Sequence, residues 1–261
     1  MPPLVDIDGL SFSFNGVNIL SDVNLCVNPN ERIMIYGANG AGKTTLLRIL
    51  GGLHIVNKYE TFQVVGSSTP NDQCRGLAYL GDRWERSVPF AGTSPYTGDV
   101  RVGDMMKTWQ NDYRERRDEL VDVLGIDLDW RMHQVSDGQR KKVQIMLGLL
   151  QPFKLLVIDE FLNSLDIIVR DRFYKYVDEE CRREGASVVY ATHIFDNLDK
   201  WMDKVMHIRH GVCNTMQNMG PFLNNRTLFE SIRDELQGER NEEIMHIDHS
   251  AGYTSGRGKQ K

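Results

Sequence analysis

The 261-residue sequence has no long hydrophobic run and no closely spaced pair of cysteines. Its longest apolar stretches, such as IMLGLL at 145–150, fall well short of the ~20 residues that a membrane-spanning helix needs. The first ten residues, MPPLVDIDGL, contain neither the basic nor the apolar part of a secretory signal. The four cysteines include no CxxC pair, so we expect reduced thiols rather than a metal site or disulfides. These absences predict a soluble protein without a membrane span, located in the cytoplasm or alternatively in the nucleus.

The sequence also has no excess of positive charge. Its 31 lysines and arginines are outnumbered by 36 aspartates and glutamates, and the formal net charge is −5. This balance argues against a broad nucleic-acid-binding surface, although it leaves a local basic patch open. Hydrophobic residues make up 41% of the chain, which is enough for an ample core.

Short apolar runs alternate along the chain with helical patterns. Four of these runs predict buried strands: ERIMIYG (31–37), LLVIDE (155–160), ASVVYATH (186–193) and KVMHIRHG (204–211). Helical patterns follow three of them, over 43–53, 167–184 and 194–201. Strands that alternate with helices predict an α/β protein whose parallel sheet is covered on both faces. Residues 5–14 partly alternate between apolar and polar, which predicts an antiparallel strand with one exposed face.

The pattern changes between about residues 84 and 150. A loop rich in Gly, Pro, Ser and Thr at 87–100 precedes one or two charged helices within 102–125. We interpret residues 84–150 as a mainly helical subdomain inserted into the α/β core. The last 13 residues, 249–261, lack Val, Ile, Leu and Met, and we expect a disordered tail there, after a single domain over 1–248.

A glycine-rich loop follows the first predicted strand of the core. Residues 37–44, GANGAGKT, match the P-loop pattern G-x-x-x-x-G-K-[ST]. Gly37, Gly40 and Gly42 allow backbone angles closed to other residues, so the loop can wrap a phosphate with its N–H groups. Lys43 is expected to reach the β- and γ-phosphates of ATP, and Thr44 to place its hydroxyl on Mg²⁺. The other residues expected to bind ATP in this loop are Asn39, Ala41 and Thr45.

Two acidic residues end the strand LLVIDE. Asp159 is expected to hold Mg²⁺ through water, and Glu160 to orient or deprotonate the attacking water. Two acids that merely end a strand are the alternative, but the P-loop in the same chain favours the catalytic interpretation. His193 follows the next strand and can donate a hydrogen bond to a γ-phosphate oxygen, unless it is an ordinary strand-end histidine. Glu160, His193 and Lys43 are therefore the catalytic candidates.

A second candidate anion site lies far along the chain, in the segment VSDGQ. Ser136 and Gln139 satisfy the capping-box pattern, so a helix is expected to begin there. Gly138 removes one side chain from the first turn, and the basic residues 140–142 put positive charge where the helix dipole disfavours it. An anion docked on this helix terminus would offset that cost. Basic side chains solvated at the surface are the alternative.

Together these motifs resemble those of the ATP-binding cassette (ABC) ATPases. VSDGQ (135–139) is similar to their LSGGQ signature. The order of the motifs along the chain is also that of the family: the P-loop, VSDGQ, LLVIDE, NSLD (163–166) and His193. The resemblance covers roughly residues 4–215. The resemblance implies a P-loop core of ABC type with an N-terminal antiparallel β subdomain and a helical insertion. It also implies ATP and Mg²⁺ as cofactors. In that family the signature, here Ser136, Gly138 and Gln139, contacts the γ-phosphate held by a partner's P-loop, so a homodimer is expected on ATP binding.

A narrower resemblance concerns residues 130–156 and 187–201. The strings WRMH, SDGQ and ATHIFD are similar to those of a small eukaryotic group of soluble cassette ATPases that lack membrane domains. One fungal member of this group associates with the CCR–NOT regulatory complex, and plants have related members. The resemblance therefore suggests a regulatory protein complex of this type as a partner.

Several positions depart from the usual family pattern. Asp137 stands where most cassettes have Gly, and Asp82 aligns with a glutamine that contacts Mg²⁺, which makes Asp82 a candidate metal ligand. Phe161 replaces the usual Pro, and Ser164 stands where the narrower group tends to have Asp. Phe14 matches the aromatic residue that stacks on adenine, with a core phenylalanine as the alternative.

The favoured function is a soluble ABC-type ATPase that hydrolyses Mg-ATP in a head-to-tail dimer and regulates a protein assembly. One alternative is the nucleotide-binding subunit of a transporter whose membrane chain is separate, with the insertion at 84–134 offering the groove for it. The other is a non-enzymatic, ATP-gated scaffold.

Overall fold

Two β-sheets of different type form the framework of the protein. The computed structural model describes residues 2–56, 58–69, 75–81 and 100–251. The strands are β1 (Val5–Phe14), β2 (Val17–Val27), β3 (Arg32–Tyr36), β4 (Thr61–Val64), β5 (Leu77–Leu80), β6 (Leu155–Asp159), β7 (Ser187–Ala191), β8 (Lys204–Arg209), β9 (Val212–Cys213) and β10 (Gln217–Asn218). The helices are α1 (Lys43–Leu50), α2 (Lys107–Asp112), α3 (Arg114–Leu124), α4 (Asp137–Gly148), α5 (Ile167–Glu184), α6 (Leu198–Trp201), α7 (Met219–Leu223) and α8 (Leu228–Ala251), with short 3₁₀ turns η2 (Val102–Asp104) and η3 (Phe161–Ser164).

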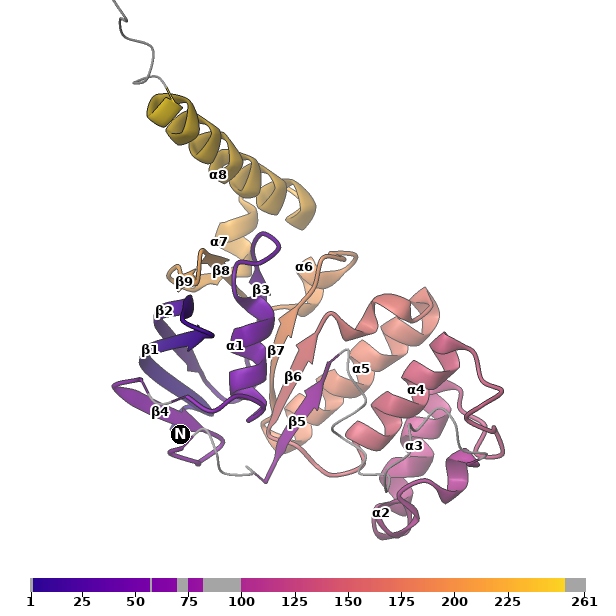
Figure 1. The fold of residues 1–261 in the computed structure, drawn as a ribbon. Coiled ribbons are helices and arrows are strands. Elements are labelled where there is room, and N and C mark those ends of the chain that lie inside the picture. Colours follow the sequence, from indigo (N-terminus) through magenta and orange to yellow (C-terminus); the bar gives the residue numbers. More distant parts are fainter. Residues whose placement is uncertain (1, 57, 70–74, 82–99, 252–261) are drawn as a thin grey trace, which may run out of the picture.

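The larger sheet has the strand order β10-β8-β3-β7-β6-β5, with β9 paired to β8. The five strands from β8 to β5 are parallel to one another, whereas β9 and β10 pair with β8 in antiparallel fashion. The smaller sheet is antiparallel, in the order β2-β1-β4. The predicted α/β architecture, with a parallel core and an N-terminal antiparallel sheet, is therefore confirmed (Figure 1).

Both faces of the parallel sheet are covered, and each has its own hydrophobic core. Along β3, Ile33 and Ile35 face one core while Met34 and Tyr36 face the other, because successive side chains of a strand alternate. The first core joins α1 to the antiparallel sheet. The second core joins α3, α4 and α5 to the opposite face. The P-loop helix and the signature helix consequently lie on opposite faces of one sheet.

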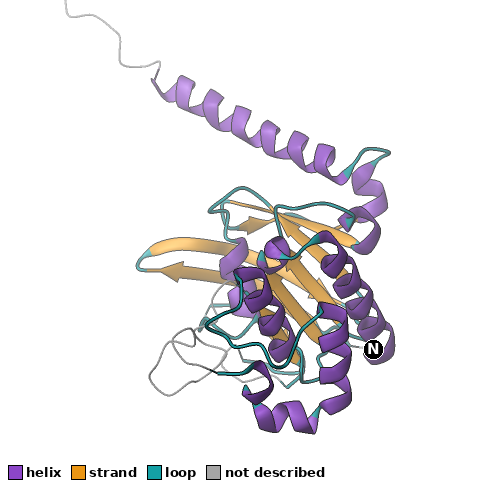
Figure 2. Ribbon diagram, turned by 90° about the vertical axis from the view of Figure 1, so that its right-hand side faces the viewer, coloured by secondary structure: helices purple, strands orange, loops and turns teal. Residues whose placement is uncertain are grey.

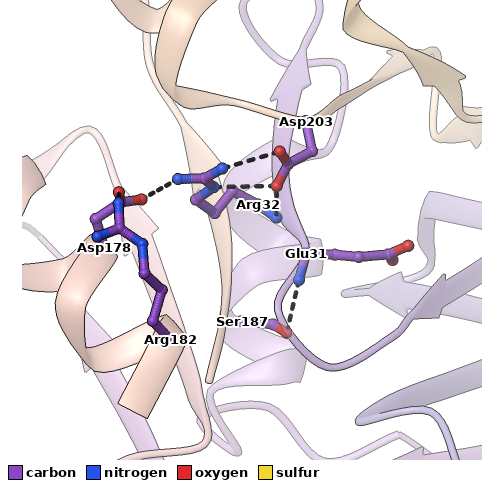
Figure 3. Close-up of polar contacts among 6 residues, drawn as sticks. All are labelled: Glu31, Arg32, Asp178, Arg182, Ser187 and Asp203. Atoms are coloured by element: carbon purple, nitrogen blue, oxygen red, sulfur yellow. Dashed lines mark hydrogen bonds and ion pairs between the residues drawn. The ribbon is translucent and has the colours of Figure 1, made fainter. Parts of the chain in front are cut away.

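The amino ends of the central strands are tied together by a polar network (Figure 3). Arg32, at the start of β3, donates to both carboxylate oxygens of Asp203 at 2.9 and 3.0 Å and also pairs with Asp178 of α5. Ser187, at the start of β7, accepts a hydrogen bond from the Glu31 backbone N–H at 3.2 Å. Planar, two-pronged arginine–carboxylate pairs combine charge with fixed geometry. These contacts hold the amino ends of the strands in place. The candidate functional site lies at the opposite end of the sheet, where the carboxyl ends of the strands are.

The helical region between β5 and β6 corresponds to the predicted insertion. Its described part comprises η2, α2, α3 and α4, whereas residues 82–99 lie outside the described residues. A buried ion pair between Arg116 of α3 and Glu180 of α5 attaches it to the core, and Arg116 also donates to the Leu149 carbonyl at 2.6 Å. Removing one partner of such a pair would leave a buried charge uncompensated, which typically costs about 3–5 kcal/mol.

The long helix α8 projects away from the body of the protein (Figure 2). It is anchored in its first half, where Glu235 pairs with the Tyr36 hydroxyl and a Glu239 oxygen lies 2.9 Å from His207 Nε2. The rings of Tyr36 and His207 stack with their centroids 4.8 Å apart. The helix runs to Ala251, past the predicted start of the tail at residue 249, and residues 252–261 lie outside the described residues. None of the helices in the described ranges is both long and apolar enough to cross a membrane.

Candidate nucleotide site

The glycine-rich loop lies at the carboxyl end of β3 and leads directly into α1. Gly37, Gly40 and Gly42 all have positive φ, at 156°, 80° and 111°. A side chain at Gly37 would place its Cβ 2.1 Å from the carbonyl oxygen of Ile208 in β8, so the loop is pressed against the neighbouring strand. A side chain at Gly40 would have no other atom within 4 Å of its Cβ. The loop is thus held from behind and open at its middle, as a phosphate cradle requires.

The ammonium group of Lys43 is folded into this loop. Its Nζ donates to the carbonyl oxygens of Gly37 at 2.9 Å and Ala38 at 3.0 Å, and the side chain is 6% exposed. Burial lowers the pKa of Lys43, while the negative charges of Glu160 and Asp159 raise it. A desolvated cation within a glycine-rich loop fits a polyphosphate, whose negative charge would stabilise the ammonium.

Thr44 and Asp159 meet between α1 and β6. The Thr44 hydroxyl donates to Asp159 Oδ1 at 3.1 Å, and the Tyr79 hydroxyl lies 3.4 Å from Asp159 Oδ2. Burial raises the pKa of Asp159, whereas the hydrogen bond from Thr44 lowers it. Among the described residues, no group of three His, Cys, Asp or Glu could hold a metal ion alone. One hydroxyl and one carboxylate suit Mg²⁺, which in nucleotide sites takes most of its other ligands from phosphate and water.

Glu160 and His193 form a pair at the carboxyl ends of β6 and β7. His193 Nε2 lies 2.9 Å from Glu160 Oε1, and both side chains are partly exposed, at 43% and 40%. Glu160 has a left-handed backbone, with φ at 51°, and its N–H donates to the Ala191 carbonyl at 2.9 Å. A non-glycine residue in this region is uncommon and often marks a functional position. The pair stands beside Asp159 and within electrostatic reach of Lys43.

The signature segment forms the predicted capping box. Gln139 N–H donates to Ser136 Oγ at 3.2 Å, and Ser136 N–H donates to Gln139 Oε1 at 2.8 Å. Gly138 lies in the first turn of α4, and Ser136 is exposed. These hydrogen bonds run within one turn, and α4 packs on the face of the sheet opposite α1. The structure therefore brings the P-loop, Asp159, Glu160 and His193 together and leaves the signature apart from them.

The basic residues after the signature have partners within the chain. Arg140 pairs with Asp137 at 2.9 Å. Lys142 Nζ lies 3.6 Å from Asp166, and Lys141 Nζ lies 4.0 Å from the ring centroid of Phe161. The charges of this helix start are thus balanced or stacked within the chain, and by themselves they do not point to an anion.

Two further predicted residues have different outcomes. Phe14, at the end of β1, is 57% exposed, so the alternative of a core phenylalanine is wrong and its ring is accessible. Asp82, the third candidate metal ligand, lies outside the described residues. Sequence reasoning missed Tyr79, which contacts Asp159 from β5, because nothing in the strand pattern LAYL distinguishes it.

Comparisons with known proteins agree with this geometry. The model of the ABC transporter family matches residues 20–163. ABC transporter I family member 20 of Arabidopsis thaliana is 38% identical over 255 residues, which cover 92% of this chain and 77% of the relative. CCR4-associated factor 16 of Saccharomyces cerevisiae is 36% identical over 225 residues, 79% of this chain and 76% of the relative.

Solved structures show the same fold. The ATP-binding subunit of an ABC transporter superposes with a TM-score of 0.74 at 21% identity, covering 90% of this chain and 99% of that one. A second, cbiO1 from Clostridium perfringens, has a TM-score of 0.67 at 20% identity, covering 94% of this chain and 100% of that one. Family model, relatives and fold converge, and the chain belongs to the ABC transporter family as an ATP-binding cassette.

Proposed function

We propose that this protein binds Mg-ATP and hydrolyses it. The observation that carries the proposal is the pair of Glu160 and His193, 2.9 Å apart, beside the P-loop lysine and the Thr44–Asp159 pair. Members of this family generally hydrolyse ATP, and the residues that this chemistry needs stand in one cluster at the carboxyl edge of the sheet.

Each residue of the cluster has a distinct task in the proposed mechanism. Lys43 leaves the carbonyls of its own loop and binds the β- and γ-phosphate oxygens. Thr44 and Asp159 would hold Mg²⁺, which would neutralise charge on the phosphates. Glu160 orients or deprotonates the attacking water, and His193 donates a hydrogen bond to a γ-phosphate oxygen.

We further propose that two copies share the nucleotides head to tail, related by a twofold axis. The exposed Ser136 lies away from the chain's own P-loop, so a second copy is needed to bring it to a γ-phosphate. Ile167 and Ile168, at the start of α5, support the same arrangement because they are 63% and 64% exposed beside Asp166. Asp166 in turn contacts the signature helix through Lys142. Apolar side chains next to the signature would be covered in such a dimer.

As the biological role we propose regulation of a protein assembly, in the cytoplasm or the nucleus. The name of the yeast relative, a CCR4-associated factor, supports a complex of the CCR–NOT type. The free thiols of Cys26, Cys181 and Cys213 suit a reducing compartment. The transporter names of the plant relatives favour a second candidate, a nucleotide-binding subunit that works with a separate membrane chain.

The substitution Glu160→Gln tests the proposed activity. The variant should bind Mg-ATP normally, hydrolyse it at least about 10²-fold more slowly, and remain a dimer in ATP during size-exclusion chromatography. It removes the carboxylate that acts on water and relieves charge repulsion next to each γ-phosphate. Asp171→Asn, an exposed charge change on α5, is the matched control and should behave as wild type. Wild-type turnover by Glu160→Gln would refute the assignment, and absent turnover in the wild type would favour the ATP-gated scaffold.

Purification of Glu160→Gln from native cells with ATP present separates the two roles. Recovery of a regulatory protein complex supports the first candidate. Recovery of a polytopic membrane protein contradicts it and supports the transporter subunit.

A further inference from the structure

The segment that follows Glu160 is attached to the signature helix by a contact between a lysine and an aromatic ring. Phe161 begins the 3₁₀ turn η3 and is 1% exposed. The ammonium group of Lys141, in α4, lies 4.0 Å from the centroid of its ring. A cation over an aromatic face is attracted by the electrons of the ring, and more strongly when both groups are shielded from water. Lys141 is half-buried, so this shielding applies.

The other end of the same segment is also attached to α4. Asp166, which follows η3, lies 3.6 Å from Lys142 Nζ and accepts the Val169 N–H at 2.9 Å as the cap of α5. Consecutive helical residues point about 100° apart. Lys141 and Lys142 therefore reach the segment from two directions, one at each end.

Glu160 has few other restraints. Its backbone N–H is bonded to Ala191, and its carboxylate contacts His193. Glu160 and Phe161 are joined by one peptide group, so the position of the Phe161 ring limits the backbone rotation of Glu160. The left-handed backbone at Glu160 persists only where the surroundings hold it.

We propose that Lys141 is a positioning residue for Glu160, acting through the ring of Phe161. This inference rests on the proposed role of Glu160 in activating water. Lys141 stands in the second turn of the helix that begins at the signature serine. Movement of that helix, when a second copy engages the signature, is then transmitted to the carboxylate at the chain's own site. Glu160 is set for hydrolysis only when the signature helix is in place.

Four variants test this inference by steady-state ATPase kinetics. Lys141→Gln and Phe161→Leu should each lower kcat about three- to tenfold without changing the KM for ATP. Lys141→Arg keeps a cation over the ring and should restore kcat to within about twofold of wild type. The double variant Lys141→Gln/Phe161→Leu should be no slower than the slower single variant, because both remove the same contact. Lys175→Gln, an exposed lysine on α5, is the control and should leave kcat unchanged.

Hydrogen–deuterium exchange of the nucleotide-free protein gives a readout that does not depend on activity. Backbone amides of residues 160–165 should exchange faster in Lys141→Gln and Phe161→Leu than in wild type or Lys141→Arg, whereas β6 should be unchanged. Wild-type exchange and kcat in Lys141→Gln would overturn the inference. A kcat loss that Arg does not rescue, together with weaker ATP binding, would also overturn it as a general folding defect. If the wild type shows no Glu160-dependent ATPase, the proposed function fails and the exchange data alone decide whether Lys141 positions this segment.

Discussion

His193 Nε2 lies 2.9 Å from Glu160 Oε1, and this contact joins the segments that follow two neighbouring parallel strands. Neither side chain is buried, so the pair is accessible to a substrate. Because the strand ends are fixed by the sheet, the two residues follow fixed points, Asp159 at the end of β6 and Ala191 at the end of β7. A γ-phosphate brought to this edge by Lys43 would meet both groups at once.

Replacement of His193 by Ala should reduce hydrolysis while sparing binding. We expect kcat to fall about 10²-fold, because both the contact to Glu160 and the proposed hydrogen bond to the γ-phosphate are lost. The affinity for Mg-ATP, measured by calorimetry, should change little, since Lys43 and the loop N–H groups remain. A variant with unchanged kcat would show that His193 only ends a strand.

Replacement of Lys43 by Ala should abolish tight ATP binding. The β- and γ-phosphates lose their cation, and we expect the affinity measured by calorimetry to fall by about 10²-fold or more. Lys175→Ala removes an exposed lysine of α5 and serves as the control. Equal affinities of Lys43→Ala and wild type would refute the assignment of the GANGAGKT loop.

Replacement of Ser136 should separate binding by one chain from dimer formation. Ser136→Arg should leave ATP binding by the monomer largely intact but prevent ATP-dependent dimers in light scattering. Because Arg also breaks the helix cap, at a cost of about 1 kcal/mol, Ser136→Asp is the sharper variant. Asp keeps a capping oxygen but places a negative charge where the partner's γ-phosphate would lie. Dimers of Ser136→Asp in ATP would count against the shared site.

Replacement of Asp159 by Asn should stabilise the nucleotide-free protein at neutral pH. Burial raises the pKa of Asp159 above its ordinary 3.8, so folding disfavours the charged form. As pH rises through the raised pKa, the buried carboxyl group ionises and the folded protein loses stability. Asn does not ionise, so the variant has no such loss. At pH 7, thermal melts should show a higher Tm for Asp159→Asn than for wild type, by about 2–4 °C for each kcal/mol of destabilisation that the substitution removes. This difference in Tm should shrink as the pH is lowered toward 3.8. A difference that grows on acidification would contradict this explanation.

The elements predicted most accurately have strong local signals. The helix expected over 167–184 is α5 with the same bounds, because Asp166 caps its start and Gly185 adopts the left-handed conformation at its end. The strand expected over 5–14 is β1 with the same bounds, since its apolar positions alternate. The helix expected over 194–201 is only α6, four residues long. In this segment Asn197 has φ at 60°, and that interrupts the helix before Leu198.

Long-range contacts could not be read from the sequence. The left-handed Glu160, the lysine–phenylalanine stack of Lys141 and Phe161, and the contact of Tyr79 with Asp159 depend on how distant segments fold together. The motif residues of the P-loop could be predicted because their function depends on local backbone geometry. The residues of these long-range contacts are ordinary types, and their role depends on the residues that pack around them in the fold.

Helix α8 is attached to the body of the protein in its first half and projects beyond it. Twenty-four residues at about 1.5 Å each make a rod of roughly 36 Å, fixed through Glu235 and Glu239 to Tyr36 and His207. Tyr36 is the residue directly before Gly37 of the P-loop. The part of the rod beyond Glu239 is about 18 Å long, so a tilt of about 10° at this anchor would move its far end by roughly 3 Å. A displacement of Tyr36 would therefore be transmitted through these contacts to α8, and it would be largest at the end of the helix that projects away from the body of the protein (Figure 2).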